Sequence, residues 1–355
     1  MLGKTRLRSV LAAAALTLGV TAGHAATALA AAPTWKQVTA WDKGQNKDGS
    51  PAVSCPTSSF CAATEPSDGY VTMFNGKSWT PGQQLRTTSH KVPKLSSITC
   101  ASAKFCLATG ALAKNQWGNA TDNVYATFNG QRWSHAVKLG SGTVSVFGGS
   151  CVSDKLCFLG AYGLGKPRGW GGVVTFDGKR WGTSLKTVGG EYSGLSCADA
   201  HFCAVASSYG GARTFNGHSW SKPVKSIKTQ AVVSCPQQGF CLLVPNGGGG
   251  PYTFDGRNWH RTTPMPNPAS GDDYATPASA VSCSSSRFCL VDGATQPDST
   301  GFTWTIGFNG RGWGPPAQLE PNEPGGDSVS CPSAYFCVAA GKQGLWTSID
   351  QYPFT

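Results

Sequence analysis

Cysteine is the residue type whose number and spacing most clearly predict chemistry in this chain. The 355-residue sequence contains 14 cysteines. They form pairs with five residues between the two members, and these pairs recur along the chain as Cys55 with Cys61, Cys100 with Cys106, Cys151 with Cys157, Cys197 with Cys203, Cys235 with Cys241, Cys283 with Cys289, and Cys331 with Cys337. Zinc sites use C-x2-C pairs or Cys/His clusters, which are absent here. The even, regularly spaced set predicts disulfides, and the constant local spacing predicts that each cysteine bonds to its own neighbour.

The first 32 residues predict export. Lys4, Arg6 and Arg8 form a basic segment, residues 10–20 are apolar and rich in alanine, and residues 28–32 offer small residues for a signal peptidase. No later stretch approaches 18 apolar residues in a row, so we expect no membrane span. We expect residues 1–32 to be a cleaved signal peptide, residues 33–355 to form one domain, and the protein to be secreted into an oxidising compartment.

Catalytic motifs are absent from the sequence. It contains no G-x-S-x-G, no HExxH and no phosphate-binding glycine loop. Asp272, Asp273, Asp327 and Glu191 could supply an acidic pair near the axis of a ring-shaped fold, as in a glycosidase. We therefore predict no catalytic residue, metal or cofactor. A carbohydrate-active hydrolase or lyase with an axial acidic pocket is kept as an alternative.

The charge balance is mildly basic. The full chain carries a net charge of +11, and loss of the three basic residues of the leader leaves 26 Lys and Arg against 18 Asp and Glu, a net charge of +8. This bias favours anionic partners such as cell-wall polymers in a salt-dependent way. Because there is no dense run of Lys and Arg, we do not expect nucleic-acid binding.

An internal repeat predicts the elements that position these residues. Six of the seven cysteine pairs are followed by Phe-[Asn/Asp]-Gly-x-x-Trp. Each unit has a strand that ends at the first cysteine, a polar turn, and a second strand that starts at the second cysteine. The Asn-Gly or Asp-Gly dipeptide predicts a second hairpin with a type I′ turn, and the flanking Phe and Trp are expected to pack between sheets. Four short strands in a unit of about 45 residues are typical of a propeller blade.

The last repeat indicates how the ring closes. After Cys337 the chain has no Phe-[Asn/Asp]-Gly-x-x-Trp, whereas Trp35 precedes the first cysteine strand. We therefore predict an all-β, seven-bladed propeller with four-stranded antiparallel blades and one disulfide per blade. In this prediction the N-terminal strand joins the last blade, and the protein is a monomer.

Variation in loop length indicates where recognition occurs. In a four-stranded meander the fixed turns lie on one side of the ring, while the second-to-third loops and the blade connections lie on the other. From the second cysteine to the Phe the spacing is 13, 22, 19, 12, 13 and 19 residues. The longest loops are expected at Gly110–Asn123, Gly160–Gly172 and Asp292–Thr303. Variable loops on a constant framework are typical of recognition sites.

Eight residues of the variable side are candidate ligand contacts. Trp117, among polar residues, is the best candidate for an exposed platform on which a sugar ring could stack, whereas Trp304 and Trp346 are expected in the core. The full candidate set is Asn115, Trp117, Tyr162, Arg168, Trp170, Asp272, Asp273 and Tyr274. Aromatic rings and Asn, Asp and Arg side chains suit a ligand that has both an apolar face and hydroxyl groups.

The repeat also resembles a known family. The S-C-x4-F-C unit followed by F-[N/D]-G-x-x-W is similar to the repeat of secreted actinobacterial β-propeller proteins, over all seven units. Proteins of that group resemble lectin-like modules, and similar propellers are the cell-targeting lectin subunits of the secreted assemblies called umbrella toxins. The resemblance implies a non-enzymatic module that binds glycans or wall polymers. A further alternative is a protein-interaction scaffold, or a targeting subunit, that meets a secreted protein partner.

Overall fold

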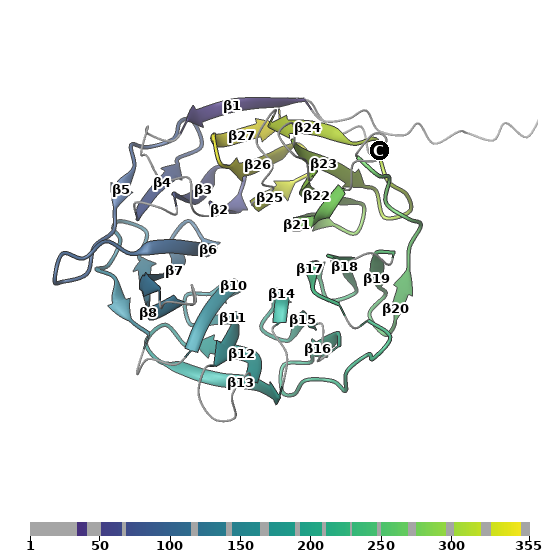
Figure 1. Ribbon diagram of the computed structural model, residues 1–355, viewed down its shortest axis with the longest axis horizontal. Coiled ribbons are helices and arrows are strands. Elements are labelled where there is room, and N and C mark those ends of the chain that lie inside the picture. The colour runs from purple at the N-terminus through teal and green to yellow at the C-terminus, as the bar shows by residue number, and fades with distance from the viewer. Residues whose placement is uncertain are drawn as a thin grey trace, which may run out of the picture.

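The computed structural model describes residues 34–40, 51–65, 69–114, 120–139, 144–163, 170–188, 192–207, 211–227, 229–246, 250–268, 275–295, 302–320 and 328–348. Within these residues, antiparallel sheets are arranged as blades around a central axis, as Figure 1 shows. Six sheets have four strands and one has three, which confirms the seven-bladed propeller. The same part of the chain contains no helix long and apolar enough to cross a membrane.

In each of the first three blades the strands follow one another from the axis outward. Blade 1 contains β2 (Ala52–Thr57), β3 (Phe60–Glu65), β4 (Tyr70–Phe74) and β5 (Gln83–Gln84). Blade 2 contains β6 (Lys94–Ser102), β7 (Phe105–Lys114), β8 (Ala120–Phe128) and β9 (Val137–Lys138). Blade 3 contains β10 (Val144–Ser153), β11 (Leu156–Gly163), β12 (Trp170–Phe176) and β13 (Trp181–Val188).

The remaining blades complete the ring. Blade 4 contains β14 (Tyr192–Asp199), β15 (Phe202–Ser207) and β16 (Arg213–Phe215). Blade 5 contains β17 (Ala231–Gln237), β18 (Phe240–Pro245), β19 (Tyr252–Phe254) and β20 (Trp259–Arg261). Blade 6 contains β21 (Ala275–Ser285), β22 (Phe288–Thr295), β23 (Thr303–Phe308) and β24 (Ala317–Glu320). Blade 7 contains β25 (Ser328–Ser333), β26 (Phe336–Gly341), β27 (Gly344–Ser348) and β1 (Trp35–Ala40).

Blade 4 departs from the four-stranded prediction at its outer edge. There the described residues form only the isolated bridges Ala212↔Val224 and Phe215↔Trp220 instead of a fourth strand. Pro223 lies between the two bridge positions and has no N–H to donate to a ladder. The outermost strands of blades 1 and 2 are also short, which limits the unpaired edge that each sheet exposes.

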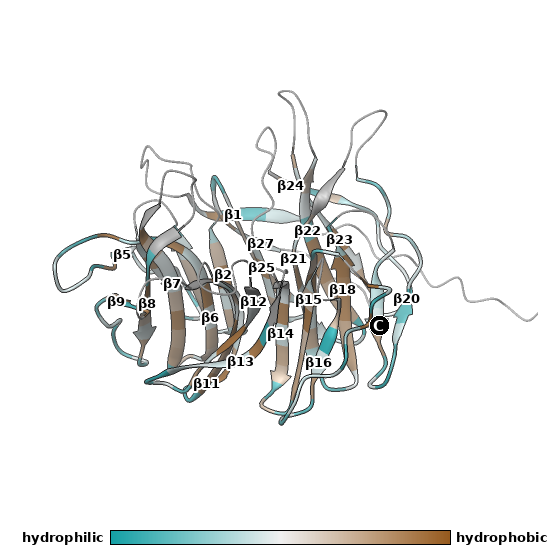
Figure 2. Cartoon of the chain, turned by 60° about the horizontal axis from the view of Figure 1, so that its bottom comes forward, coloured by the Kyte–Doolittle hydropathy of each residue, from teal (hydrophilic) through white to brown (hydrophobic). Residues whose placement is uncertain are grey.

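The core lies between the blades. Among the described residues, seven hydrophobic clusters each join one blade to the next. The second strands β15, β18 and β22 are buried at every position because both of their faces meet a neighbouring sheet. Figure 2 shows hydrophobic residues on β18 and β23 and hydrophilic ones on the outer strands β1 and β20. Within six blades the framework Phe and Trp centroids lie 4.7–5.5 Å apart. The expected packing between neighbouring sheets is confirmed, because framework rings also contact rings of the next blade, as Phe254 does with Phe202 at 5.5 Å and Phe74 with Phe336 at 5.8 Å.

The disulfide pairing predicted from spacing is confirmed. Every bond lies within one blade, and the seven bonds are Cys55–Cys61, Cys100–Cys106, Cys151–Cys157, Cys197–Cys203, Cys235–Cys241, Cys283–Cys289 and Cys331–Cys337. In blade 2, for example, the two cysteines are directly opposed across β6 and β7, with their Cα atoms 3.9 Å apart. Each bond therefore closes the hairpin between the two strands nearest the axis.

Burial gives the disulfides a structural role and excludes them from a ligand-binding surface. The second cysteine of every pair is completely buried, and these residues are Cys61, Cys106, Cys157, Cys203, Cys241, Cys289 and Cys337. The first cysteines are also buried, at the inner edge of each blade. In each blade, the pair thus belongs to the scaffold, and a ligand must be bound by other side chains.

The second turn of the repeat is not a type I′ turn, so that prediction was wrong. Only the glycine has a positive φ, between 85° and 93°, and the preceding Asn or Asp does not. In blade 1, Asn75 Oδ1 accepts hydrogen bonds from the backbone N–H groups of Lys77 and Ser78, both at 3.0 Å. Phe74 and Trp79 pair across a four-residue connection. The side-chain oxygen thus binds the backbone N–H groups of the turn, as in other turns that begin with Asn or Asp.

A pair of glycine substitutions tests how the two turns pack. A Cβ on Gly310 would lie 2.3 Å from the Ser286 carbonyl oxygen in the neighbouring hairpin turn, whereas a Cβ on Gly256 would meet nothing closer than 3.5 Å. Both glycines have positive φ, 85° and 93°, so alanine costs about 1 kcal/mol at either site. Gly310→Ala is expected to cost about 1–3 kcal/mol more, because the backbone must move. Urea denaturation measures both values, and equal losses would contradict this packing.

The blades are also connected by a belt of hydroxyl groups that the sequence analysis missed. The residue before each first cysteine is Ser or Thr, and in six blade pairs its hydroxyl oxygen accepts a hydrogen bond from the cysteine N–H of the next blade at 2.8–3.0 Å. Between blades 3 and 4, Ser150 instead donates to the Cys197 carbonyl at 3.3 Å. Ser330 of blade 7 binds Cys55 of blade 1, so the belt is continuous around the axis.

Ring closure by the N-terminal strand is confirmed. Strand β1 pairs antiparallel with β27, and Trp35 lies opposite Ser348. The Trp35 indole N–H donates to Thr305 Oγ1 of blade 6 at 3.0 Å, and the ring packs with Phe288. The framework Trp220 makes the same type of contact with the preceding blade, through Ser184 Oγ at 2.9 Å. Trp35 therefore occupies the position that the last repeat lacks.

Candidate functional site

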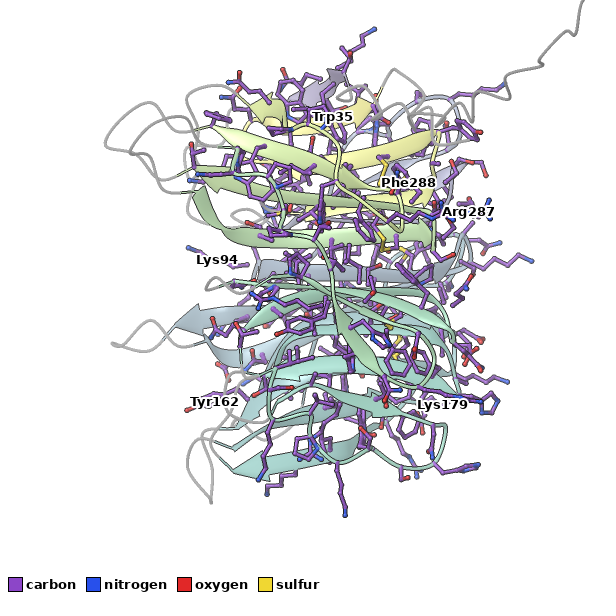
Figure 3. The ribbon with its side chains drawn as sticks, turned by 90° about the vertical axis from the view of Figure 1, so that its right-hand side faces the viewer. Trp35, Lys94, Tyr162, Lys179, Arg287 and Phe288 are labelled. Carbon is purple, nitrogen blue, oxygen red and sulfur yellow. A yellow bond between two sulfur atoms is a disulfide. The ribbon has the colours of Figure 1, made fainter. Side chains whose placement is uncertain are left out.

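The two sides of the ring are built from different connections. Figure 3 shows the ring edge-on, with Lys94 and Tyr162 on one side and Lys179 and Arg287 on the other. The side of Lys94 and Tyr162 contains the second-to-third strand ends and the blade connections, and is called the loop face. The side of Lys179 and Arg287 contains the cysteine hairpin turns and the Asn/Asp-Gly turns, and is called the turn face.

Strand length varies on the loop face. Blades 2, 3 and 6 have second strands of 10, 8 and 8 residues, whereas the second strands of blades 4 and 5 have 6 residues each. The long blades are those with the largest spacing between the second cysteine and the Phe. In blade 2 the ladder between β7 and β8 continues to the pair Lys114↔Ala120. The extra residues thus raise the paired strands above the loop face at three positions around the ring.

The expected long loops are in part strands, so their predicted bounds were too wide. Gly110–Lys114 belongs to β7, Gly160–Gly163 to β11 and 170–172 to β12. Asp292, placed at the start of a loop, lies in β22 with a fully buried side chain. The loops were predicted from the spacing between the second cysteine and the Phe, but part of the extra length forms paired strand, because pairing with the adjacent strand outweighs the weak local preference of Gly and Asn.

Two candidate ligand residues lie within the described residues. Tyr162 is half-buried in β11, where its backbone is opposite Ser145 and Gly171. Trp170 begins β12, opposite Gly163 and Val188. The structure therefore brings both residues to the loop-face end of blade 3. The other six candidates, Asn115, Trp117, Arg168, Asp272, Asp273 and Tyr274, lie outside the described residues, as do Glu191 and Asp327 of the axial alternative.

The two tryptophans assigned to the core are found in strands. Trp304 is completely buried in β23, and a Cβ on the cross-strand Gly293 would lie 2.2 Å from its ring. Trp346 is half-buried in β27, between Ala339 and Gln37. The core prediction is confirmed for Trp304, and neither residue extends the set of candidate contacts.

One ion pair lies at the base of the raised strands of blade 2. Lys138 Nζ donates to Asp122 Oδ1 at 2.9 Å, and this hydrogen bond is the main reason that the pKa of Asp122 is below its usual value. Both side chains are exposed, so the pair contributes little stability by itself. Asp122 also has a φ of 53°, which small polar residues tolerate. The pair links a side chain of β8 to one of the outer strand β9.

Metal-ligating side chains do not gather in the described part of the chain. There, no group of three or more His, Cys, Asp or Glu residues is placed to hold a metal ion. The site that these observations define is a rigid ring with raised strand pairs on one face.

Fold and site together define a disulfide-containing seven-bladed β-propeller. No family model matches the chain, and no curated protein matches its sequence. Solved structures share the fold at low identity. YCF48 bound to a D1 peptide has a TM-score of 0.59 and 12% identity, with 89% of this chain and 96% of that chain covered. Virginiamycin B lyase from Staphylococcus aureus has a TM-score of 0.57 and 7% identity, with 89% and 98% covered. The WD40 β-propeller domain of Doa1 has a TM-score of 0.56 and 13% identity, with 90% and 98% covered.

Proposed function

We propose that this protein is a secreted, non-enzymatic binding module that recognises glycans or cell-wall polymers through its loop face. One observation carries the proposal: the blades repeat the same turns on one face, while strand pairs of different length rise from the other in blades 2, 3 and 6. A rigid scaffold that varies on a single face is the usual arrangement of a recognition protein. Because the raised blades differ from one another, one to three sites are expected, not seven equivalent ones.

Secretion is part of the same proposal. Seven disulfides would be unstable in a reducing cytosol but persist outside the cell, and the basic and apolar leader supports export. The resemblance of the repeat to secreted actinobacterial propellers supports a lectin-like role. A protein partner is the second candidate, because the similar propeller YCF48 is seen with a bound peptide.

Glycan-array binding by the mature, oxidised protein tests the proposal. Trp117→Ala and Tyr162→Ala are each expected to weaken binding about tenfold, the loss of one aromatic contact, while the melting temperature stays unchanged for Trp117→Ala. The matched control is Tyr335→Ala, because Tyr335 is 60% exposed and lies on the turn face. It should bind like the wild type.

Two outcomes would contradict parts of this proposal. Undiminished binding by Trp117→Ala would remove Trp117 as a contact, and the absence of any glycan ligand would favour a secreted protein partner, to be isolated from culture medium.

The double change Asp272→Asn and Asp273→Asn distinguishes the binding module from the enzymatic alternative. It leaves a binding module intact, whereas an acid-dependent hydrolase would lose turnover of the bound glycan.

A further inference from the structure

The turn face carries a concentration of positive charge that the proposed glycan site does not use. In the cysteine hairpins, the position just before the second strand is a cation in three blades, as Lys104, Lys155 and Arg287. All three side chains are exposed, and Figure 3 shows Arg287 on this side of the ring. The hairpin turn is the end of each blade, so a long side chain at this position extends into solvent.

The Asn/Asp-Gly turns add six more exposed cations to the same face. They occupy the two variable positions before the Trp and are Lys77, Arg132, Lys179, Arg180, Arg257 and Arg311. The turn itself orients them. In blade 3 the backbone N–H groups of Lys179 and Arg180 point inward and donate to Asp177 Oδ1 at 2.9 and 2.7 Å. Their side chains are consequently free to point outward from a fixed backbone.

The cations of these turns outnumber the carboxylates, because nine Lys and Arg side chains stand against four Asp side chains, Asp154, Asp177, Asp199 and Asp255, so the turn face keeps a net positive charge. Asp177 and Asp255 use one carboxylate oxygen to bind two backbone N–H groups each, and those hydrogen bonds lower the pKa of both, that of Asp255 to about 2. Asp199 accepts hydrogen bonds from the His201 N–H and from Gln238. The ion pairs found among the described residues join Lys138 to Asp122 and His260 to Asp255, and neither contains a turn-face Lys or Arg.

The cations are distributed over five of the seven blades. Blades 1, 2, 3, 5 and 6 each contribute at least one, and blade 4 contributes the exposed His201 and His218 at the equivalent positions. Positive charge spread over so much of the face fits a flexible chain with a regularly repeated negative charge better than a small anion. Five of the nine cations are Arg, whose planar fork matches the oxygen atoms of phosphate.

We propose that the turn face is a docking surface for a flexible phosphodiester polymer of the polyol-phosphate class. Duplex nucleic acid fits less well, because its persistence length of about 50 nm prevents it from following the ring. Single-stranded nucleic acid is held largely by stacking on aromatic side chains. Of the described turn-face aromatics, only Tyr335 is substantially exposed. The proposal is independent of glycan binding because it concerns the opposite face of the ring.

Binding of a synthetic poly(glycerol phosphate) to the mature, oxidised protein tests the proposal. In the turn-face variant, Lys179, Arg180, Arg287 and Arg311 are each replaced by Gln. The matched control replaces Lys36, Lys91, Lys222 and Lys225, which are also exposed but lie outside the turns, so that both variants lose the same net charge. The turn-face variant is expected to bind at least about tenfold more weakly at low salt. The slope of the logarithm of its binding constant against the logarithm of the salt concentration should become shallower by about 2 to 3. The control should bind within about twofold of the wild type.

Three other outcomes of this experiment would each overturn the proposal. Equal losses in the two variants would mean that net charge alone attracts the polymer. Tighter binding of duplex or single-stranded DNA at the same salt concentration would assign the face to nucleic acid, and absence of binding by the wild type would leave the face without this role. Thermal unfolding checks that both variants are folded. The turn-face variant should keep its glycan-array signal, so that a failure here is distinct from a failure of the proposed function.

Discussion

Replacing Trp35 by alanine is expected to lower the free energy of unfolding by about 3 kcal/mol. The indole is the part of β1 that fills the space between blades 7 and 6, where it packs with Phe288 and donates to Thr305. Each disulfide joins the two inner strands of one blade, and none includes β1. Closure of the ring by β1 therefore depends on hydrogen bonds and packing. The loss corresponds to a decrease of about 5–10 °C in the melting temperature.

Differential scanning calorimetry measures this effect, with Val38→Ala as the control. Val38 lies on the same strand but is 39% exposed, so its truncation should change the free energy of unfolding by less than about 0.5 kcal/mol. Two variants that are equally stable would show that β1 is dispensable and that the other blade contacts are sufficient to close the ring.

Reduction of the disulfides is expected to have the largest effect. Each bond closes a small loop and contributes about 2 kcal/mol in the chain-entropy description, and the chain has seven of them. Even with incomplete additivity, full reduction should remove more than about 5 kcal/mol, comparable to the total stability of a typical domain. The reduced protein is therefore expected to unfold near physiological temperature.

The measurement compares melting of the oxidised and reduced protein, with thiol labelling to verify complete reduction. Because one sulfur of each pair is fully buried, reduction should require heat or denaturant. Replacing Cys100 and Cys106 together by serine isolates one blade and should cost about 2 kcal/mol. An unchanged melting temperature after verified reduction would contradict the assigned role of the bonds.

The ring and its covalent pattern could be predicted from sequence because the repeat fixes distances along the chain. Constant spacing defined the disulfides, and Trp35 was recognisable because the last repeat lacks a tryptophan at the equivalent position. The hydroxyl belt had a visible signal, since Ser or Thr precedes every first cysteine. Its role depends on the neighbouring blade, however, and therefore could not be derived from one repeat considered alone.

The candidate site was less predictable, for two physical reasons. The extra length after Gly110 predicted a loop, but the ladder of β7 and β8 continues past this residue because pairing with an adjacent strand outweighs local preference. The turn face was interpreted as framework because its spacing is constant. Constant spacing indicates a constant backbone, but the side chains at the variable positions of the turn, such as Lys179 and Arg180, can still form a charged surface.

The pairing of the first and last strands in blade 7 has a mechanical consequence. Trp35 at the start of β1 is paired with Ser348 at the end of β27, so the chain enters and leaves the ring at the same end of an antiparallel ladder. Tension applied between these two residues pulls the two strands apart sideways and loads their hydrogen bonds one at a time. The ring would thus open at low force at this seam. Further extension would unfold the blades in turn. Each blade would extend by less than its full chain length, because the disulfide keeps tension off the segment between its two cysteines.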